Sequence, residues 1–178
     1  MQKTRDAGYI GGLSGKLHLS TCNYSVCKIS ERRINDGYDY FAWSHGHGPQ
    51  HDWPMHAYIM WLKSQGIEYA NPRKEDCKYV RTGMPAEYHQ TKWCADRAIE
   101  FIDNVKDFGQ PWFFSFNCFD PHHAFDPPPE YLERYMPILD EIPLPNYVEG
   151  ELDDKSPFQR RDPVSYTHLR AHETLSDL

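Results

Sequence analysis

The chain lacks any long hydrophobic run. In its 178 residues no stretch approaches the roughly 20 apolar residues that a membrane-spanning helix needs. The first ten residues, MQKTRDAGYI, also lack the apolar core of a secretory signal peptide. The sequence therefore predicts no membrane partner and leaves the cellular compartment unknown.

Basic residues and paired cysteines are also scarce. The formal charge is -7, which argues against nucleic acid as a partner, since phosphate backbones are bound by many clustered lysines and arginines. The five cysteines show no C-x-x-C spacing, which argues against a zinc ribbon or a dense disulfide framework. We expect most of these cysteines to be free thiols, although two of them could form one disulfide. GGLSGK lacks the spacing of a phosphate-binding P-loop.

The composition is that of a globular domain, with 39% hydrophobic and 15% aromatic residues. A glycine-rich strand is predicted over Tyr9–Ser14, where the glycines indicate a close backbone approach or a tight turn. If the chain continues extended, Lys16 and His18 share one face, because side chains alternate along a strand.

Two helices and a second strand follow. A short helix is predicted over roughly 55–64, ending before Gly66. A longer helix closes at Gly109 and Pro111, and its predicted packed face is Thr91, Ala95, Ala98, Ile102 and Val105. The run WFFSFNC, 112–118, is typical of a strand covered on both faces. A helix before such a strand predicts an α/β fold with a mixed, mostly parallel sheet flanked by helices.

The sequence DPHH comes directly after that second strand. In open α/β sheets ligands bind outside the carboxyl ends of the strands. Lys16, His18 and either His122 or His123 would then form a small cationic cluster that suits a tetrahedral oxyanion. The alternative is that Lys16 is a solvated lysine and His122 a turn histidine bonded to the backbone.

The segment from Gly37 to His56 is aromatic and histidine-rich but has no sustained period, which predicts a long surface excursion. Its histidines could be zinc ligands, although structural zinc usually needs compact ligand pairs and thiolates, so a solvated or substrate-facing loop is favoured. The histidines are His45, His47, His51 and His56. Tyr38, Trp43 and Trp53 suit either stacking on a substrate ring or core packing.

Several segments resemble the type I sulfatases of the alkaline phosphatase superfamily. AGYIGGLSGKLHLS is similar to their segment with GK-W-HL, and WFFSFNCFDPHHAFDPPPEYLERY is similar to their segment with DPHHPFDPPPEY. DGYDYF and HQTKWCADRAIEFI are similar to intervening segments, in the same order. The resemblance implies an arylsulfatase-like sulfuric ester hydrolase acting on a small aryl or sugar sulfate.

Carried over by position, the resemblance implies a role for four residues. Lys16 and His18 match the sulfate-contacting lysine and histidine, and His122 matches the histidine that faces the leaving oxygen. His123 is a neighbouring substrate-binding candidate. In this family a hydrated formylglycine attacks sulfur beside a bound calcium ion, and family members can be periplasmic or extracellular.

The departures from the family are equally informative. No C-x-P-S-R or S-x-P-S-R string occurs, so the sequence offers no nucleophile, and we recognise no calcium ligand. We therefore expect 1–161 to be an internal part of a sulfatase domain, inactive alone. We expect 162–178 to be a sequence artefact, and assign His168 and His172 no function. The alternatives are a phosphate or phosphonate ester hydrolase of the same superfamily and a non-catalytic truncated product.

Overall fold

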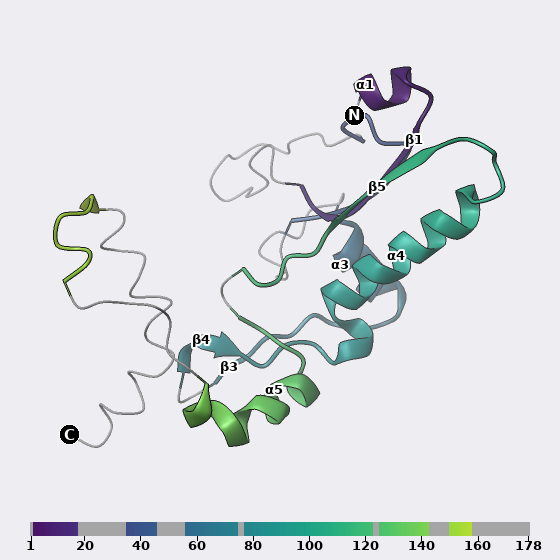
Figure 1. Ribbon diagram of the computed structural model, residues 1–178. Helices are drawn as coiled ribbons and strands as arrows, with labels where there is room; N and C mark the ends of the chain where they lie inside the picture. Colours follow the sequence, from purple (N-terminus) through teal and green to yellow (C-terminus); the bar gives the residue numbers. More distant parts are fainter. Residues whose placement is uncertain are drawn as a thin grey trace, which may run out of the picture.

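The computed structural model describes residues 2–17, 35–45, 56–74, 77–122, 125–142 and 150–157. This part of the chain contains both helices and strands (Figure 1). The predicted domain boundary near Arg161 lies outside these residues. None of the described helices is both long and apolar enough to cross a membrane. In order, the elements are α1 (Gln2–Asp6), β1 (Ile10–Lys16), β2 (Tyr40–Ser44), α3 (Ala57–Ser64), β3 (Arg73–Lys74), β4 (Cys77–Arg81), the 3-10 helix η2 (Ala86–Tyr88), α4 (Gln90–Val105), β5 (Trp112–Asn117), α5 (Pro129–Tyr135) and the 3-10 helix η3 (Met136–Glu141).

Three parallel strands of the described chain form a sheet in the order β2-β1-β5. Ile10 pairs with Trp112, and Gly12 pairs with both Tyr40 and Phe114. A parallel pair needs a crossover connection, and α3 and α4 lie in the connection between the paired strands β1 and β5. The predicted α/β fold is thus confirmed, and the two predicted strands, the glycine-rich β1 and the aromatic β5, pair with each other.

The central strand β1 is glycine-rich because α4 lies directly on it. A Cβ at Gly12 would lie 2.5 Å from the ring of Phe114 and 2.7 Å from that of Phe101, which is far inside van der Waals contact. Phe101 belongs to α4, and its ring centroid is 5.0 Å from that of Phe114. The predicted close approach at these glycines is confirmed, because only a residue without a side chain fits between the two rings.

The longer predicted helix is confirmed as α4, but its packed face is rotated from the predicted one. The buried residues are Gln90, Trp93, Cys94, Phe101 and Val105, whereas Ile102 is exposed. The larger rings of Trp93 and Phe101 bury more apolar area than an alanine or isoleucine stripe would, so they determine which face meets the sheet.

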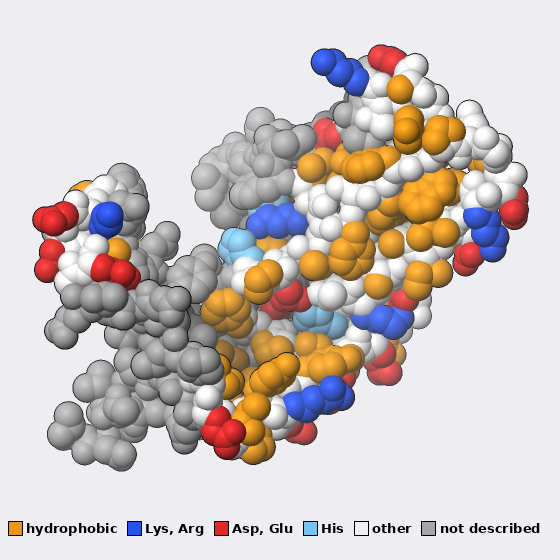
Figure 2. All heavy atoms as spheres, in the orientation of Figure 1, with side chains coloured by type: hydrophobic (Ala, Val, Ile, Leu, Met, Phe, Trp, Pro, Cys, Tyr) orange, Lys and Arg blue, Asp and Glu red, His pale blue; other side chains and the backbone are white. Residues whose placement is uncertain are grey.

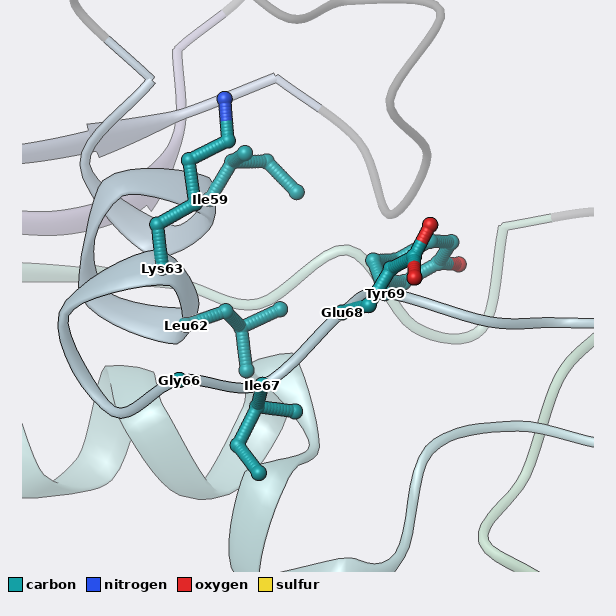
Figure 3. A pocket seen from close by; sticks show the side chains of 7 residues that line it. All are labelled: Ile59, Leu62, Lys63, Gly66, Ile67, Glu68 and Tyr69. Carbon is teal, nitrogen blue, oxygen red and sulfur yellow. The ribbon is translucent and has the colours of Figure 1, made fainter.

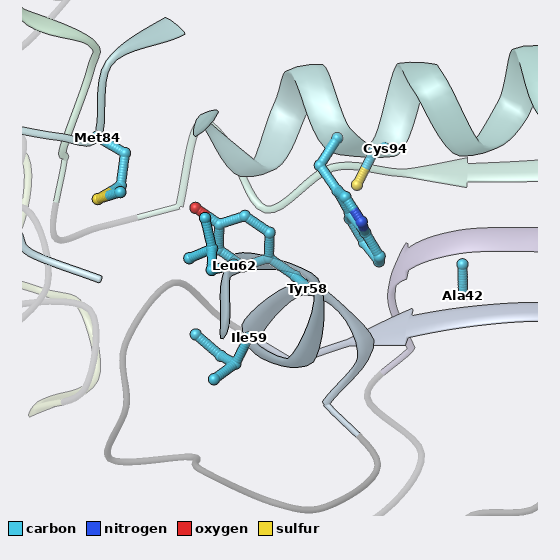
Figure 4. Close-up of a cluster of buried hydrophobic side chains, with 7 residues drawn as sticks. Ala42, Tyr58, Ile59, Leu62, Met84 and Cys94 are labelled. Carbon is cyan, nitrogen blue, oxygen red and sulfur yellow. The ribbon is translucent and has the colours of Figure 1, made fainter. Parts of the chain in front are cut away.

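A core forms where α3 packs against α4 (Figure 4). Tyr58 and Leu62 on α3 are each 1% exposed, and Tyr58 lies 5.6 Å from Trp93 between ring centroids. The Tyr58 hydroxyl donates a 2.7 Å hydrogen bond to the Tyr88 carbonyl, which satisfies its only donor. The predicted short helix before Gly66 is therefore a core element.

The predicted surface excursion between Gly37 and His56 is wrong over the residues that the structure describes. Tyr40–Ser44 is strand β2, and Tyr38 and Trp43 pack with Leu13 in a second buried cluster. Trp43 is 1% exposed, so core packing, rather than stacking on a substrate, applies to it. Tyr38 is also buried, and Trp53 lies outside the described residues.

The prediction that 112–118 is covered on both faces is also wrong. The residues form a parallel strand, β5, but it is an edge strand of the described sheet. Trp112, Phe113 and Phe116 are 42%, 45% and 46% exposed. A continuous apolar run indicates a parallel strand but does not indicate whether that strand is central.

The proline-rich segment after β5 is hydrogen-bonded to the end of β4 and to the residues that follow it. Arg81 N–H donates a 2.7 Å hydrogen bond to the Phe125 carbonyl, and Gly83 N–H donates to the Pro127 carbonyl at 3.1 Å. A Cβ at Gly83 would lie 1.9 Å from the Asp126 carbonyl oxygen. This close contact fixes the path by which the chain leaves the sheet and enters α5, where Pro129 occupies the first turn.

Candidate functional site

The carboxyl ends of β1 and β5 lie side by side. Gly15 pairs with Asn117, and Asn117 Nδ2 donates a 2.9 Å hydrogen bond to the Lys16 carbonyl. Gly15 has a φ of +97°, and a Cβ there would lie 2.0 Å from the Asn117 carbonyl oxygen. Glycine at this position therefore lets the two strand ends approach, which places the segments that follow them at one edge of the sheet.

Lys16 and His122 meet at the ring of Phe119. Lys16 Nζ lies 4.7 Å from the centroid of that ring, and the His122 ring centroid lies 4.6 Å from it. Phe119 and His122 belong to one turn, in which His122 N–H donates to the Phe119 carbonyl at 3.1 Å. The structure thus brings two of the residues predicted to form a cationic cluster, which are far apart in the sequence, to the same aromatic ring.

The other two predicted site residues, His18 and His123, lie outside the described residues. His18 follows Leu17, the last described residue after β1, and His123 follows the exposed His122. Their roles therefore stay predictions that rest on the sequence.

Gln90, at the start of α4, connects the site to the interior and was missed by sequence reasoning. It is 1% exposed. Its Nε2 donates a 2.6 Å hydrogen bond to Ser44 Oγ at the end of β2, and its Oε1 accepts one of 2.9 Å from Phe119 N–H. Gln90 therefore fixes the turn that carries Phe119 and His122 relative to the sheet. The sequence around Gln90, HQTKWC, gives no clear signal of this role.

A second polar cluster lies beside the turn, around His89. The His89 ring accepts a 3.3 Å hydrogen bond from Thr91 N–H at Nδ1, which caps α4, and its Nε2 is 3.2 Å from the Asp126 carbonyl oxygen. Thr91 Oγ1 donates a 2.5 Å hydrogen bond to Asp120 Oδ2, and Tyr69 donates one of 3.0 Å to Asp126 Oδ2. This cluster ties the start of α4 to both ends of the loop after β5.

Ligand atoms of His89, Asp120 and Asp126 lie within 4.8 Å of one another, close enough to share a metal ion. Calcium takes six to eight oxygen ligands. Here Nδ1 of His89 already accepts from a backbone N–H, and Asp120 and Asp126 each accept from a neighbouring hydroxyl. The group does not fit the calcium that the family resemblance implies, and its present hydrogen bonds are those of a structural cluster.

The thiols of Cys94 and Cys118 are not activated as nucleophiles. Burial, followed by the charges of Cys118 and Asp120, raises the pKa of Cys94 to about 12. Burial, followed by the charge of Asp120, also raises the pKa of Cys118. Both are free thiols, as predicted. A thiolate nucleophile is therefore disfavoured at either position near neutral pH.

A cavity of about 610 Å³ opens next to the turn, between the N-termini of α4 and α5 and the end of β5. Figure 2 shows histidine, acidic and basic side chains among hydrophobic ones on this face. The cavity is lined by aromatic rings and by polar groups of the His89 cluster, including Phe116, Tyr131, Thr91 and Asp120. It lies beside Asp120, two residues from His122.

Another cavity, of about 460 Å³, lies at the end of α3 (Figure 3). Its walls are mostly apolar, from Ile59, Leu62 and Ile67, with Lys63 and Glu68 also lining it. It contains none of the predicted site residues.

The zinc alternative for the histidines between 45 and 56 is not supported among the described residues. His56 is fully buried and caps α3, because its Nδ1 accepts a 3.4 Å hydrogen bond from Ile59 N–H. Its ring lies 6.0 Å from that of Trp43. His45 is partly buried, and His47 and His51 lie outside the described residues.

Compared with models of known protein families and with curated proteins, the chain matches none. The assignment of a function therefore rests on the residues and their geometry.

Proposed function

We propose that this chain is part of the catalytic domain of a hydrolase that cleaves sulfate esters, and that Lys16 and His122 bind the sulfate group. The observation that carries the proposal is that both residues contact Phe119 at the carboxyl ends of two adjacent parallel strands. Ligands of open α/β sheets bind at this edge. The resemblance of the GK-x-HL and DPHH segments to those of type I sulfatases, in the same order, gives independent support from the sequence.

In this proposal Lys16 supplies a positive charge that attracts the anion and offsets charge that grows on its oxygens in the transition state. His122 is exposed on a hydrogen-bonded turn, so its ring can donate a proton or a hydrogen bond to the leaving oxygen. His18 and His123 would add donors to the same anion. Gln90 holds the turn in place without contacting the substrate.

The attack on sulfur would be supplied by formylglycine and calcium in the full enzyme. Neither is provided by the described residues, since the His89 cluster does not fit calcium and the chain has no formylglycine motif. We therefore expect this 178-residue chain to show no turnover of an aryl sulfate. Turnover by highly purified chain at the rate of a full sulfatase would contradict that expectation.

Anion binding tests the proposal without requiring turnover. Sodium sulfate is titrated into the full chain at constant ionic strength, while NMR follows the imidazole signals of His122. A Lys16→Met variant should bind sulfate about tenfold to a hundredfold more weakly, the range expected for loss of a hydrogen bond from a charged donor. Lys106→Met is the matched control, because Lys106 is an exposed lysine at the C-terminal end of α4.

If sulfate leaves the His122 signals unchanged, or if the Lys16→Met and Lys106→Met variants bind equally well, the proposal is wrong. The same titration with inorganic phosphate separates the related enzyme class. Tighter binding of phosphate than of sulfate would favour a phosphate ester hydrolase, because both anions are tetrahedral and would use the same groups.

In a full-length enzyme that contains this segment, steady-state kinetics of variants would distinguish the roles of His122, His123 and Lys16. His122→Ala should lower kcat by about a hundredfold to ten-thousandfold, most for poor leaving groups, as expected for loss of a general acid. His123→Ala should have a smaller effect. Lys16→Ala should weaken both substrate binding and kcat, because its charge acts in the ground state and in the transition state.

A further inference from the structure

We infer that Phe119 is a positioning residue of the anion site, whose ring holds the Lys16 ammonium group and the His122 imidazole in place before an anion binds. The inference rests on the proposed function, because it concerns the same site. It adds a third member to that site, one that carries no charge and acts through the two basic groups.

The contact between Phe119 and Lys16 is a cation–π interaction. Lys16 Nζ lies over the ring, 4.7 Å from its centroid, inside the roughly 6 Å within which the face of an aromatic ring attracts a cation. A carboxylate can also hold a lysine, but its negative charge offsets the positive charge that attracts an anion. An uncharged ring holds the ammonium group and leaves its charge available to the anion.

The ring restrains the part of Lys16 that the sheet does not. The backbone of Lys16 is fixed at the end of β1, where it pairs with Ser44 and its carbonyl accepts from Asn117 Nδ2. The side chain is long, and ordering such a side chain on binding costs rotamer entropy and lowers affinity. A lysine that is already held in the free protein loses less freedom when the anion arrives.

The same ring packs against the other basic group of the site. The centroids of the Phe119 and His122 rings are 4.6 Å apart, and the ring planes are inclined by 38°. Aromatic rings attract each other at this separation. The two residues also belong to one turn, closed by the hydrogen bond from His122 N–H to the Phe119 carbonyl. Ring and backbone contacts together therefore limit where the exposed imidazole can point.

Phe119 can position its neighbours because it is itself attached to the interior. Its N–H donates a 2.9 Å hydrogen bond to Oε1 of the buried Gln90, whose Nε2 donates to Ser44 Oγ at the end of β2. The ring thus connects the rigid core to two basic groups, one at the end of β1 and one after β5.

Nuclear magnetic resonance of the full chain without added anion tests the contact. Protons over the face of an aromatic ring are shifted upfield, so the ε-methylene protons of Lys16, next to Nζ, should show this shift in the wild type. The shift should be lost in Phe119→Leu, which keeps an apolar side chain but no ring, and retained in Phe119→Tyr. Phe108→Leu, at an exposed position after α4, should leave it unchanged.

Sulfate titration of the same variants at constant ionic strength tests the consequence for binding. Phe119→Leu should bind sulfate about threefold to tenfold more weakly, the effect expected when one long side chain is no longer ordered in advance. Phe119→Tyr and Phe108→Leu should bind as the wild type does. Circular dichroism and the urea midpoint show whether each variant is folded, which separates a loss of positioning from a loss of structure.

A double-mutant cycle shows whether the ring acts through Lys16. In Lys16→Met there is no ammonium group for the ring to hold, so adding Phe119→Leu should weaken sulfate binding by a smaller factor than it does in the wild type. An equal factor in the two backgrounds would overturn the inference, because the effect of the ring would then be independent of the lysine.

Other results would also overturn the inference. They are a folded Phe119→Leu variant that binds sulfate as tightly as the wild type, and a folded Phe119→Tyr variant that binds as weakly as Phe119→Leu. Absence of the upfield shift of Lys16 in the wild type would do the same, whether or not any variant folds. A wild type that shows the shift but binds no sulfate would instead contradict the proposed function, and the inference with it.

Discussion

Gln90 and Ser44 are joined by a 2.6 Å hydrogen bond in the interior of the protein, from the amide Nε2 to the hydroxyl Oγ. The other end of the same amide accepts from the Phe119 N–H. One buried side chain thus spans the end of β2, the start of α4 and the turn after β5.

Gln90→Leu should lower the free energy of unfolding by about 1–3 kcal/mol, because the Phe119 N–H and the Ser44 hydroxyl lose a buried hydrogen-bond partner. Urea unfolding followed by tryptophan fluorescence measures the change. Gln65→Leu is the matched control, since Gln65 is exposed at the end of α3 and should change stability by less than about 0.5 kcal/mol. Equal effects of the two substitutions would show that the Gln90 contacts are not stabilising.

Gly15→Ala should destabilise the protein by roughly 3 kcal/mol or more, because the new methyl group meets the Asn117 carbonyl at 2.0 Å and the backbone has a positive φ. Gly66→Ala separates the two causes. Gly66 also has a positive φ, of +71°, but no atom lies within 4 Å of the added Cβ, so a loss of about 1 kcal/mol is expected. Urea midpoints that are the same for both variants would contradict the close approach of β1 and β5.

Acid should weaken the attachment of β2 to β1 through Asp39. Its carboxylate accepts a 2.9 Å hydrogen bond from Gly11 N–H and pairs with Arg5, and these contacts hold the pKa of Asp39 below its ordinary value of 3.8. The unfolded chain binds a proton at higher pH than the folded one, so this stabilisation is complete above the ordinary pKa and is lost as the pH falls through the lowered one.

The corresponding experiment compares the urea midpoint of the wild type and Asp39→Asn from pH 6 down to pH 3. The difference between them should shrink as the pH falls through about 3.8 and below. Asp107→Asn, at an exposed position after α4, serves as the control. A difference that stays constant across this range would mean that the Asp39 charge does not stabilise the fold.

Cys94 should be protected from thiol reagents in the native protein. It has no exposed surface, and burial is the largest cause that raises its pKa to about 12. Brief treatment with iodoacetamide at pH 7.5, followed by mass spectrometry, should label Cys118 before Cys94, since Cys118 is partly exposed. In urea the two should react at similar rates. Native labelling of Cys94 as fast as Cys118 would show that α4 separates readily from β1.

The meeting of Lys16 and His122 could be predicted because it depends on a general property of parallel sheets. Lys16 ends the strand recognisable by its glycines and His122 follows the one recognisable by its aromatic residues, and the carboxyl ends of parallel strands meet at one edge. The role of Gln90 could not be predicted in this way. Its partners Ser44 and Phe119 are 46 and 29 residues away in the sequence, and a polar residue at the start of a helix is usually solvated.

The incorrect predictions about the fold have similar causes. YFAWS, which forms β2, is too short to show a period between the turn residues before it and the histidines after it. Ile102 and Phe101 are adjacent on α4, and only the shape of the sheet surface decides which of them is buried. Likewise, the composition of β5 does not show that it lies at the edge of the described sheet.

The central position of β1 has a consequence for the timing of folding. Ile10 pairs with Trp112, about 100 residues later in the chain. During synthesis at about 5–20 residues per second, β1 leaves the ribosome several seconds before β5 can reach it. Contacts of such high sequence separation also slow folding in solution. The edge that carries Lys16 and His122 is thus assembled only after α3 and α4 have been made.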